Sequence, residues 1–360
     1  MQFVEFVEFV DQFVDHSDQT PHQQMINSIS LKNAGPVTNF QLKNAGQINL
    51  LVGSNSCGKT FILKTLYTAI KTIEEYKRGN ELRNDSEILA SKLYWTFQAD
   101  KIGDLVTKGS SEQLSFESKI DNKEFSFAFG KETSKQVSNF TNKTTPRNSN
   151  SIFLPAKETL SLHHIILETR QKDKLFGFDD TYLDLALALQ PTTKGRNYEE
   201  FAASRKSLES LLGGKVEIDE KTQKWFFKKG SSKFAIGATA EGIKKIAILD
   251  TLLGNRYLDP KSIIFIDEPE AALHPSAISE FLQILYKLSQ TGIQIFMATH
   301  SYFVIKQMFL LAQEHQTSIP IACWNQGEWN NSDLKDEMPQ NSIIDESINI
   351  YKSEVNLQLK

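Results

Sequence analysis

The chain has 360 residues, of which 40% are hydrophobic and 23% are charged, and these proportions exclude collagen-like, disulfide-rich and disordered classes. Its length suits one large α/β domain or a core domain with an inserted lobe. A net charge of −4 argues against a generally basic nucleic-acid binder, so nucleic acid is a possible partner that composition does not support.

Cysteine usage and hydropathy predict the compartment. The two cysteines, Cys57 and Cys323, lie in no metal-ligand or disulfide pattern, which favours a reducing cytoplasm. No apolar run reaches the roughly 18 residues of a membrane span, and the N-terminus carries acids where a signal peptide needs basic residues. We therefore expect a cytoplasmic protein that does not insert into a membrane.

The first 24 residues differ from the rest of the chain. Residues 3–15 repeat a Phe-Val-acid triplet, and on a helix the Phe and Val side chains would share one face. A docking helix and an appended tail both fit this pattern. Met25 directly precedes the first convincing strand and could be an alternative start, so an N-terminal extension or tail is the simpler interpretation of residues 1–24.

The first chemical motif follows an apolar strand. Strand patterns begin at Ile26, and Ile48–Val52 then runs directly into Gly53-Ser54-Asn55-Ser56-Cys57-Gly58-Lys59-Thr60. Residues 61–73 carry apolar side chains at helical spacing, so Thr60 opens a helix whose N-terminus faces the glycine loop. This order of strand, loop and helix is the context that a phosphate-binding loop requires.

Phosphate binding explains the residue types in this loop. In the pattern G-x-x-x-x-G-K-[ST], the glycines let the backbone curl so that successive N–H groups point at phosphate oxygens, and the helix dipole favours anions. We predict that Lys59 contacts the β- and γ-phosphates and that the Thr60 hydroxyl binds Mg²⁺. The predicted nucleotide-binding residues are Gly53, Asn55, Ser56, Gly58, Lys59 and Thr60.

The sequence patterns in the middle of the chain predict elements that are added to the core domain. Residues 112–130 alternate as a hairpin, and residues 131–150, dense in Lys, Ser, Asn and Thr, predict a mobile surface loop at a boundary. The run 157–213 is mostly helical in pattern and predicts an inserted lobe. The other elements predicted here are a helix over 85–98, a strand over 152–154 and a hairpin around 216–227.

The last third of the chain predicts a helix and then three apolar strands separated by helices. Such alternation indicates an α/β fold with a mostly parallel sheet covered on both faces. The predicted helix spans 241–253, and the strands span 263–266, 293–298 and 319–323, followed by a tail. We divide the chain into 1–24, a first core half at 25–150, a helical lobe and hairpin at 151–235, and a second core half at 236–360.

Two of these strands end in residues suited to phosphate chemistry. Asp267 ends the first and can bind Mg²⁺, and Glu268 follows it, where it can act as general base on the attacking water. The next strand ends at His300, whose neutral imidazole can hydrogen-bond a γ-phosphate or that water. We therefore predict Glu268 and His300 as catalytic residues.

These residues resemble the ATPase heads of the ABC type, in the branch shared with SMC-like proteins and the ATPase parts of overcoming-lysogenization-defect proteins. The resemblance covers nearly the whole chain from Met25, and it implies a P-loop NTPase with an ABC-ATPase-like head, a β-rich subdomain, an inserted helical lobe, and ATP with Mg²⁺ as ligands. It rests on the phosphate loop and on segments 240–245, 267–275 and 298–301. Segments 154–158 and 343–347 look more narrowly like compact stand-alone bacterial AAA-domain ATPases, many of them encoded in anti-phage defence or toxin-antitoxin loci.

In such heads two subunits meet head to tail, and the signature segment of one covers the ATP of the other. Ala240-Glu241-Gly242 looks like the signature equivalent, and its helix N-terminus would supply N–H donors to a γ-phosphate across the interface. Ala240 stands where the family often has Ser, which removes one hydroxyl contact and puts activation across the interface in doubt. By the same resemblance, the interface loop would be Leu273 and His274, and the Q-loop ligand of Mg²⁺ would be Gln98, unless Gln98 is an ordinary polar helix end.

The resemblance implies an ATPase that forms homodimers or higher homo-oligomers and controls a separately encoded effector, a nuclease or toxin, in anti-phage defence. No sustained heptad repeat lies between Thr60 and Asp267, so we expect no long coiled-coil arms, and no fused nuclease fits after Glu268. One rival is a DNA-binding SMC-like ATPase of repair or processing that grips DNA with the 131–150 loop and the lobe. The other is a slow switch module that rarely hydrolyses its nucleotide.

Overall fold

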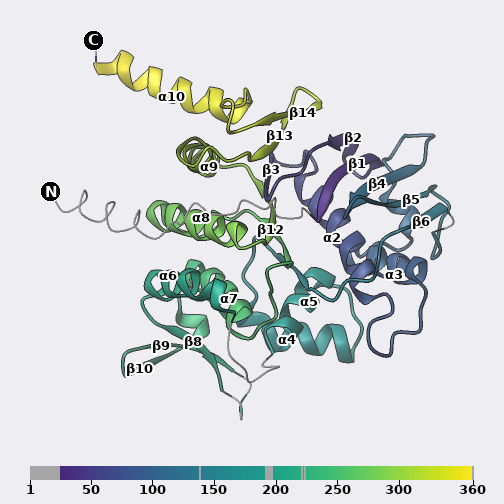
Figure 1. Cartoon of the computed structure of the whole chain (residues 1–360), viewed down its shortest axis with the longest axis horizontal. Coiled ribbons are helices and arrows are strands. Elements are labelled where there is room, and N and C mark those ends of the chain that lie inside the picture. Colours follow the sequence, from purple (N-terminus) through teal and green to yellow (C-terminus); the bar gives the residue numbers. More distant parts are fainter. Residues whose placement is uncertain (1–24, 138, 191–197, 220–221, 223, 359–360) are drawn as a thin grey trace.

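A six-stranded sheet forms the centre of the computed structural model, which describes residues 25–137, 139–190, 198–219, 222 and 224–358. Its strand order is β14-β13-β3-β12-β11-β7 (Figure 1). All its neighbours pair in parallel except β14, which is antiparallel to β13, so the predicted mostly parallel core is confirmed. The strands are β3 (Ile48–Val52), β7 (Ser151–Leu154), β11 (Ile263–Asp267), β12 (Gln294–Thr299), β13 (Pro320–Asn325) and β14 (Glu328–Asp333).

Both faces of the sheet are covered, which explains why its inner strands are mostly apolar and almost fully buried. In β3, the side chains of Leu50 and Val52 belong to one hydrophobic core and that of Leu51 to a second core on the other face. Figure 1 shows α8 and α9 on one side of the sheet and α2 on the other. The covering helices are α2 (Lys59–Glu75), α7 (Glu241–Gly254), α8 (Pro275–Gln290) and α9 (Tyr302–Glu314).

A second, antiparallel sheet has the order β2-β1-β4-β5-β6 and adds its apolar face to the core around α2. Phe125, Phe127 and Phe129 are buried in alternation along β5, as predicted for the hairpin. The prediction of a loop over 131–150 is wrong where β6 forms. This polar edge strand is held by backbone pairing with β5 and by the packing of Phe140 on Phe125. The strands are β1 (Ile26–Ala34), β2 (Val37–Leu42), β4 (Leu114–Ile120), β5 (Lys123–Phe129) and β6 (Asn139–Asn142).

Short helices and a small sheet follow β7. Because β7 pairs with β11, the core sheet includes the first residues of the segment 151–235, and the helical part begins after them. The hairpin predicted around 216–227 gains a third strand in the order β10-β9-β8. These elements are α4 (His163–Leu167), α5 (Asp180–Ala188), α6 (Ala202–Leu212), β8 (Lys215–Ile218), β9 (Trp225–Lys229) and β10 (Ser232–Ala235), and α3 (Asp85–Phe97) lies earlier, next to α2 and α5.

The C-terminal part contains a helix where the sequence predicted only a tail. Helix α10 (Ser342–Gln358) extends away from the sheets in Figure 1. Asn341 starts it, because its side-chain oxygen accepts hydrogen bonds from the backbone N–H groups of Ile343 and Ile344. Ile344 is buried, whereas Ile348 and Tyr351 are exposed, so α10 is attached mainly at its first turn.

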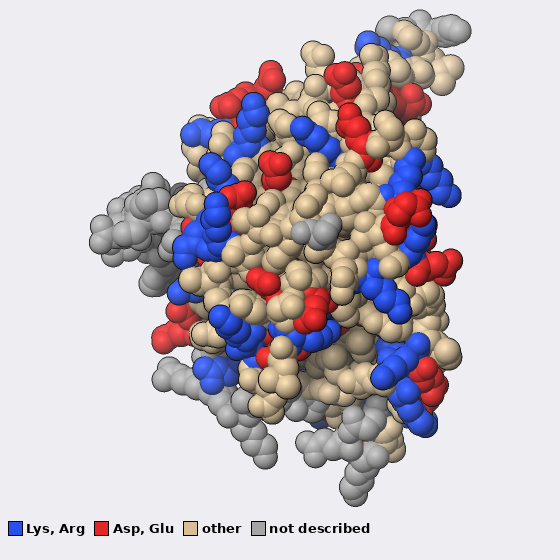
Figure 2. Space-filling view, turned by 90° about the vertical axis from the view of Figure 1, so that its right-hand side faces the viewer, with Lys and Arg blue, Asp and Glu red and all other residues tan. Residues whose placement is uncertain are grey.

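The surface shows mixed charge on the side in view. In Figure 2, Lys and Arg residues are interspersed with Asp and Glu. This face therefore lacks the one-sign stripe that tracks a nucleic-acid backbone. Across the described part of the chain, no helix combines the length and the apolar character that crossing a membrane requires.

Candidate functional site

The phosphate loop follows β3 and leads into α2. Gly58 has a φ of 102°, and a Cβ atom added there would lie 2.5 Å from a methyl carbon of Val37, so both conformation and space require glycine. The loop lines a cavity of about 290 Å³. Glu268, which is distant in sequence from the loop, lines the same cavity. The loop residues that line it are Asn55, Ser56, Gly58, Lys59 and Thr60.

Lys59 is buried and bonded within the loop. Its Nζ atom donates hydrogen bonds to the carbonyl oxygens of Gly53 and Ser54 at 2.7 and 2.8 Å. A buried ammonium group needs such partners, because removing its charge from water costs several kcal/mol, on the order estimated for buried ions. The cation is thus held beside the N-terminus of α2, where its predicted contact with phosphate requires it.

Thr60 and Asp267 are brought together across 207 residues of sequence. The Thr60 hydroxyl lies 2.9 and 3.1 Å from the two carboxylate oxygens of Asp267. Burial raises the pKa of Asp267 and the nearby Glu268 charge raises it further, while the hydrogen bond from Thr60 lowers it. Two of the three predicted magnesium ligands therefore lie at one point, at the carboxyl ends of β3 and β11.

Glu268 and His300 also meet. His300 Nδ1 lies 3.1 Å from Glu268 Oε1, and both side chains are partly exposed. Glu268 has a φ of 49°, in the left-handed region that non-glycine residues seldom occupy. Its N–H group donates to the carbonyl oxygen of Ala298 on the neighbouring strand at 2.9 Å, so the unusual conformation is fixed by the sheet.

Lys245 and Glu270 complete the surroundings of Glu268, and sequence reasoning gave neither of them a role. Lys245 Nζ of α7 donates to the carbonyl oxygen of Glu268, and Glu270 accepts the Thr299 hydroxyl at 2.7 Å. Burial lowers the pKa of Lys245 to about 8, against the opposing charges of Glu270, Asp267 and Glu268. Lys245 lies in the segment that carried the family resemblance, but only the folded chain reveals its partner.

The predicted signature segment forms the start of α7. Ala240 is the N-cap and makes no side-chain cap hydrogen bond. A Cβ atom added at Gly242 would lie 2.7 Å from the Ala272 carbonyl oxygen and equally close to a Leu273 methyl carbon, so this segment and the predicted interface loop pack as one unit. Glu241 and His274 are exposed, and His274 Nδ1 lies 2.9 Å from the Ser276 hydroxyl at the start of α8. The interface role of these residues stays a prediction.

The side-chain oxygen of Gln98 is bonded to a group other than Thr60 and Asp267. It is the C-cap of α3, and its side-chain oxygen accepts the Gly177 N–H group at 3.2 Å. A carboxamide binds a metal through this oxygen, which is already bonded here. Its Nε2 atom is buried with no hydrogen-bond partner among the described residues. The predicted metal role of Gln98 stays a prediction.

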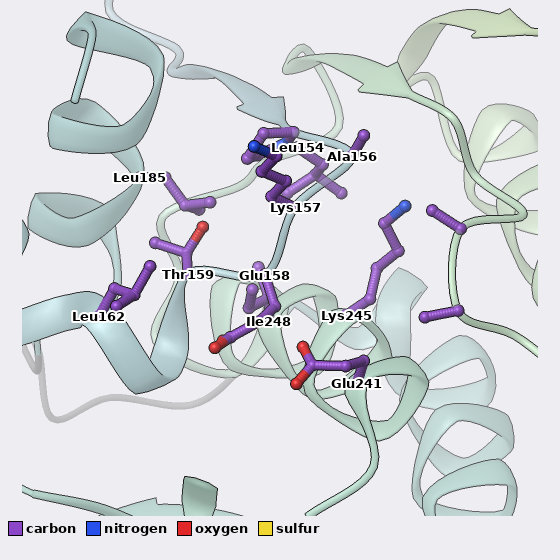
Figure 3. Close-up of a pocket in the computed structure, with 13 residues that line it drawn as sticks. Leu154, Ala156, Lys157, Glu158, Thr159, Leu162, Leu185, Glu241, Lys245 and Ile248 are labelled. Atoms are coloured by element: carbon purple, nitrogen blue, oxygen red, sulfur yellow. The ribbon is translucent and has the colours of Figure 1, made fainter. Parts of the chain in front are cut away.

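A second cavity, of about 300 Å³, lies beside the signature segment (Figure 3). Leu162 and Leu185 line one side of it, while Glu241 and Lys245 of α7 line the other. The loop after β7, with Lys157 and Glu158, and the segment Ala271–Ala272 also contribute to its wall. The residues after β7 thus approach α7 without filling the space between them.

Ion pairs tie the phosphate-loop helix to the lobe. One turn after Thr60, Lys64 forms a 2.6 Å pair with Asp179, which also caps α5 by accepting the Thr181 N–H group. Further along α2, the Tyr67 hydroxyl donates to Asp184 of α5 at 2.7 Å. The sequence could have shown that Lys64, four residues after Thr60, lies on the same face of the helix. It could not have shown that Asp179 is the partner of Lys64.

The residues at the Thr60–Asp267 pair fit a magnesium ion. Mg²⁺ takes oxygen ligands and is commonly held by one or two protein side chains together with substrate phosphates and water. The Thr60 hydroxyl and the Asp267 carboxylate supply such oxygens. Over the residues that the structure describes, no group of three or more His, Cys, Asp or Glu side chains could hold a metal. A site that depends on phosphate oxygens is therefore consistent with these residues.

Comparison with known proteins gives the family. Residues 48–306 match the family described as "AAA domain, putative AbiEii toxin, Type IV TA system", which is more than half of the chain. The chain belongs to this family. It has an AAA domain, as the sequence motifs predicted, and its fold is similar to that of an SMC head. A curated relative of this AAA-domain protein is the Old nuclease of Escherichia phage P2, 52% identical over 40 residues, which are 11% of this chain and only 7% of the nuclease.

Solved structures with a similar fold are SMC heads. The SmcHead bound to the C-winged helix domain of ScpA is 13% identical, with a TM-score of 0.52 over 86% of this chain and 97% of that chain. The SMC head domain from Thermotoga maritima is 12% identical, with a TM-score of 0.45 over 86% of this chain and 99% of that one. The first likeness agrees with the predicted ABC-ATPase-like head with its mixed α/β content.

Proposed function

We propose that this AAA-domain protein binds ATP with Mg²⁺ in the phosphate loop and hydrolyses it. The observation that carries the proposal is the meeting of Thr60 with Asp267, and of Glu268 with His300, beside one loop. Bound Mg²⁺ would neutralise charge on the β- and γ-phosphate oxygens. Lys59 would bind the same phosphates, exchanging its carbonyl partners for theirs.

Glu268 is the proposed general base for the attacking water. The carboxylate is partly exposed in the loop cavity, so water can reach it, and its left-handed backbone fixes its direction. His300 would orient the carboxylate through the 3.1 Å contact and leave its second oxygen for water. This assignment makes Glu268 the residue whose loss separates ATP binding from hydrolysis.

We further propose that two copies close head to tail, with the start of α7 from one copy against the ATP of the other. The uncapped N-terminus of α7 supports this, because free N–H groups at a helix N-terminus bind anions. The assembly would control a separately encoded effector, a nuclease or toxin, in the bacterial cytoplasm during phage infection. The family description and the local match to Old nuclease support an effector of this kind.

The Glu268→Gln variant tests the proposal. The wild type should hydrolyse ATP, and the variant should bind ATP while hydrolysis falls by about 10²–10⁴-fold, the usual contribution of a general base. Size-exclusion chromatography with light scattering measures the mass of the particle. With ATP, the variant should have at least twice the mass of the wild-type protein. If Glu268→Gln hydrolysed ATP at the wild-type rate, Glu268 would not be the general base. If its mass did not depend on ATP, the proposed head-to-tail assembly would be wrong.

The effector part needs a separate measurement. Tagged Glu268→Gln protein should retain a nuclease or toxin from its native cells in the presence of ATP, and the double variant with Lys59→Ala should release it. Cells that lack either the ATPase or the captured protein should lose the same resistance in a phage plaque assay. An ATPase deletion that leaves plaque formation unchanged would contradict the defence role but not ATP hydrolysis.

A further inference from the structure

Helix α7 joins two parts of the composite site that would serve different ATP molecules. Its start, Ala240 to Gly242, is the proposed contact with the ATP of a partner copy, whereas Glu268 acts on the ATP of its own chain. Within one chain these parts are physically connected. Gly242 packs directly on Ala272, in the segment after Glu268, and Lys245 bonds the Glu268 carbonyl oxygen.

The contact of Lys245 is specific. Its side chain is buried, and its ammonium group donates to a backbone oxygen that already accepts the Ala271 N–H group at 3.0 Å. That oxygen belongs to the one residue of the catalytic pair whose backbone occupies the left-handed region. A shift of Lys245 therefore changes the forces on the peptide that sets the direction of the Glu268 side chain.

The surroundings allow such a shift. Lys245 and Glu241 border the cavity of about 300 Å³ from the α7 side, with Leu162 and Leu185 across it (Figure 3). The cavity leaves room on that side for a movement of the Lys245 side chain and of the first turn of α7. The neighbouring Lys244 is different, because it is bonded to Glu241 at 2.8 Å and to the Ser161 hydroxyl at 2.9 Å.

We propose that Lys245 is a positioning residue that transmits the state of the α7 N-terminus to Glu268 of the same chain, and so couples hydrolysis at the two ATP sites of a head-to-tail pair. The inference rests on the proposed ATP hydrolysis and head-to-tail assembly. When the start of α7 engages the partner's ATP, Lys245 holds the Glu268 peptide in the orientation that activates water at its own site. Hydrolysis then depends on both sites being filled, which is a coupling free energy between them.

Lys245→Met tests the inference, because it keeps the length of the side chain and removes the donor. Hydrolysis rates over a range of ATP concentrations should give a sigmoidal curve for the wild type. Lys245→Met should lower kcat by about tenfold to a hundredfold, as expected for a misplaced catalytic group, and make the curve hyperbolic. Its affinity for a non-hydrolysable ATP analogue should stay within about twofold, because Lys245 does not line the loop cavity.

Matched variants separate positioning from a loss of structure. Lys71→Met removes a buried ammonium group of α2 that pairs with Glu74 at 2.9 Å, and it should leave the curve sigmoidal. Lys245→Arg keeps a charged donor and should recover most of the lost kcat. If Lys245→Met does not fold, as judged by thermal unfolding, Lys245→Leu, which also lacks a donor, replaces it with the same expected result.

The outcomes are distinct. Wild-type kcat and a sigmoidal curve for Lys245→Met would overturn the inference while the proposed ATPase function stands. An equal loss in Lys71→Met would also overturn it, since the loss would come from removing any buried ammonium group. A lowered kcat with the sigmoidal curve retained would refute the coupling. A wild type that hydrolyses no ATP would refute the proposed function, and this inference with it.

Discussion

The phosphate-loop side of the molecule and the start of α7 differ in how far one chain satisfies their polar groups. Lys59 and Thr60 bond to groups of their own chain, and Glu268 is fixed by β12 and α7. Ala240 and Glu241 are exposed, and although Glu241 pairs with Lys244, the backbone N–H groups at the start of α7 have no side-chain cap. Under the proposed function, nucleotide binding would be a property of one chain, whereas activation would depend on a second surface. The following variants test that division.

Lys59→Ala should have the largest effect. It removes the buried cation from the loop, and loss of one member of a buried charge pair costs about 2–5 kcal/mol, or roughly 30-fold to 4,000-fold in ATP affinity. Isothermal titration with a non-hydrolysable ATP analogue measures this loss. Lys157→Ala, which lies at the second cavity and not in the loop, is the control and should bind normally. Normal binding by Lys59→Ala would show that the loop is not the nucleotide site.

Gly242→Val should reduce hydrolysis and spare binding. The added carbons collide with the Ala272 carbonyl oxygen and Leu273, so the start of α7 must move away from the interface loop. We expect kcat to fall by about tenfold to a hundredfold, because misplacement of about 1 Å has effects of that size. Gly237→Val is the matched control, since a Cβ atom there meets no atom within 4 Å. A tenfold weaker binding of ATP analogue by Gly242→Val would contradict the division between the two surfaces.

His300→Ala should have a smaller effect on kcat, about tenfold. The variant removes the imidazole 3.1 Å from the Glu268 carboxylate but leaves the base itself. Steady-state hydrolysis at saturating ATP measures the change. His164→Ala removes a similar exposed histidine, 3.7 Å from Glu168, and should hydrolyse at the wild-type rate. Unchanged kcat in His300→Ala would assign that histidine a structural role only.

Asp179→Asn should have the smallest effect, on stability. The substitution keeps an oxygen that can cap α5 but removes the charge that pairs with Lys64 at 2.6 Å. Because this pair is mostly buried, we expect unfolding free energy to fall by about 1–2 kcal/mol in urea denaturation. Glu124→Gln breaks an exposed pair with Lys143 and should change stability by less than about 0.5 kcal/mol. Equal effects of the two variants would show that the α2–α5 tie is no stronger than a surface pair.

Local patterns were sufficient to predict the parts of the fold whose residues are close in sequence. The loop from Gly53 to Thr60 carries its own strand and helix, and β11 with Asp267 is an apolar run that ends in acids. Strands β6 and β14 and helix α10 were missed because polar edge strands and a helix attached by one turn have weak apolar periodicity. Backbone pairing and the Asn341 cap define them instead.

The residues of the candidate site also fall into those that local patterns predicted and those that depend on contacts between distant segments. Residue types at the loop and at the strand ends gave Lys59, Thr60, Asp267, Glu268 and His300 before any geometry was known. Lys245 and Lys64 could not be assigned partners, because their contacts join elements that are distant in sequence. Gln98 was assigned as a Q-loop ligand by the family resemblance, and its bonding to Gly177 depends on a contact between segments that are distant in sequence.

Strand β14 has a consequence for a protein that is proposed to assemble with itself. An open sheet edge can pair with another chain and lead to aggregation, and proteins avoid this with polar residues or by covering the edge. The sequence of β14 is polar apart from Trp329, and Asn331 donates a hydrogen bond to the Gln41 carbonyl oxygen of β2 at 2.7 Å. The second sheet therefore covers part of this edge, which disfavours the joining of the core sheets of two copies through β14.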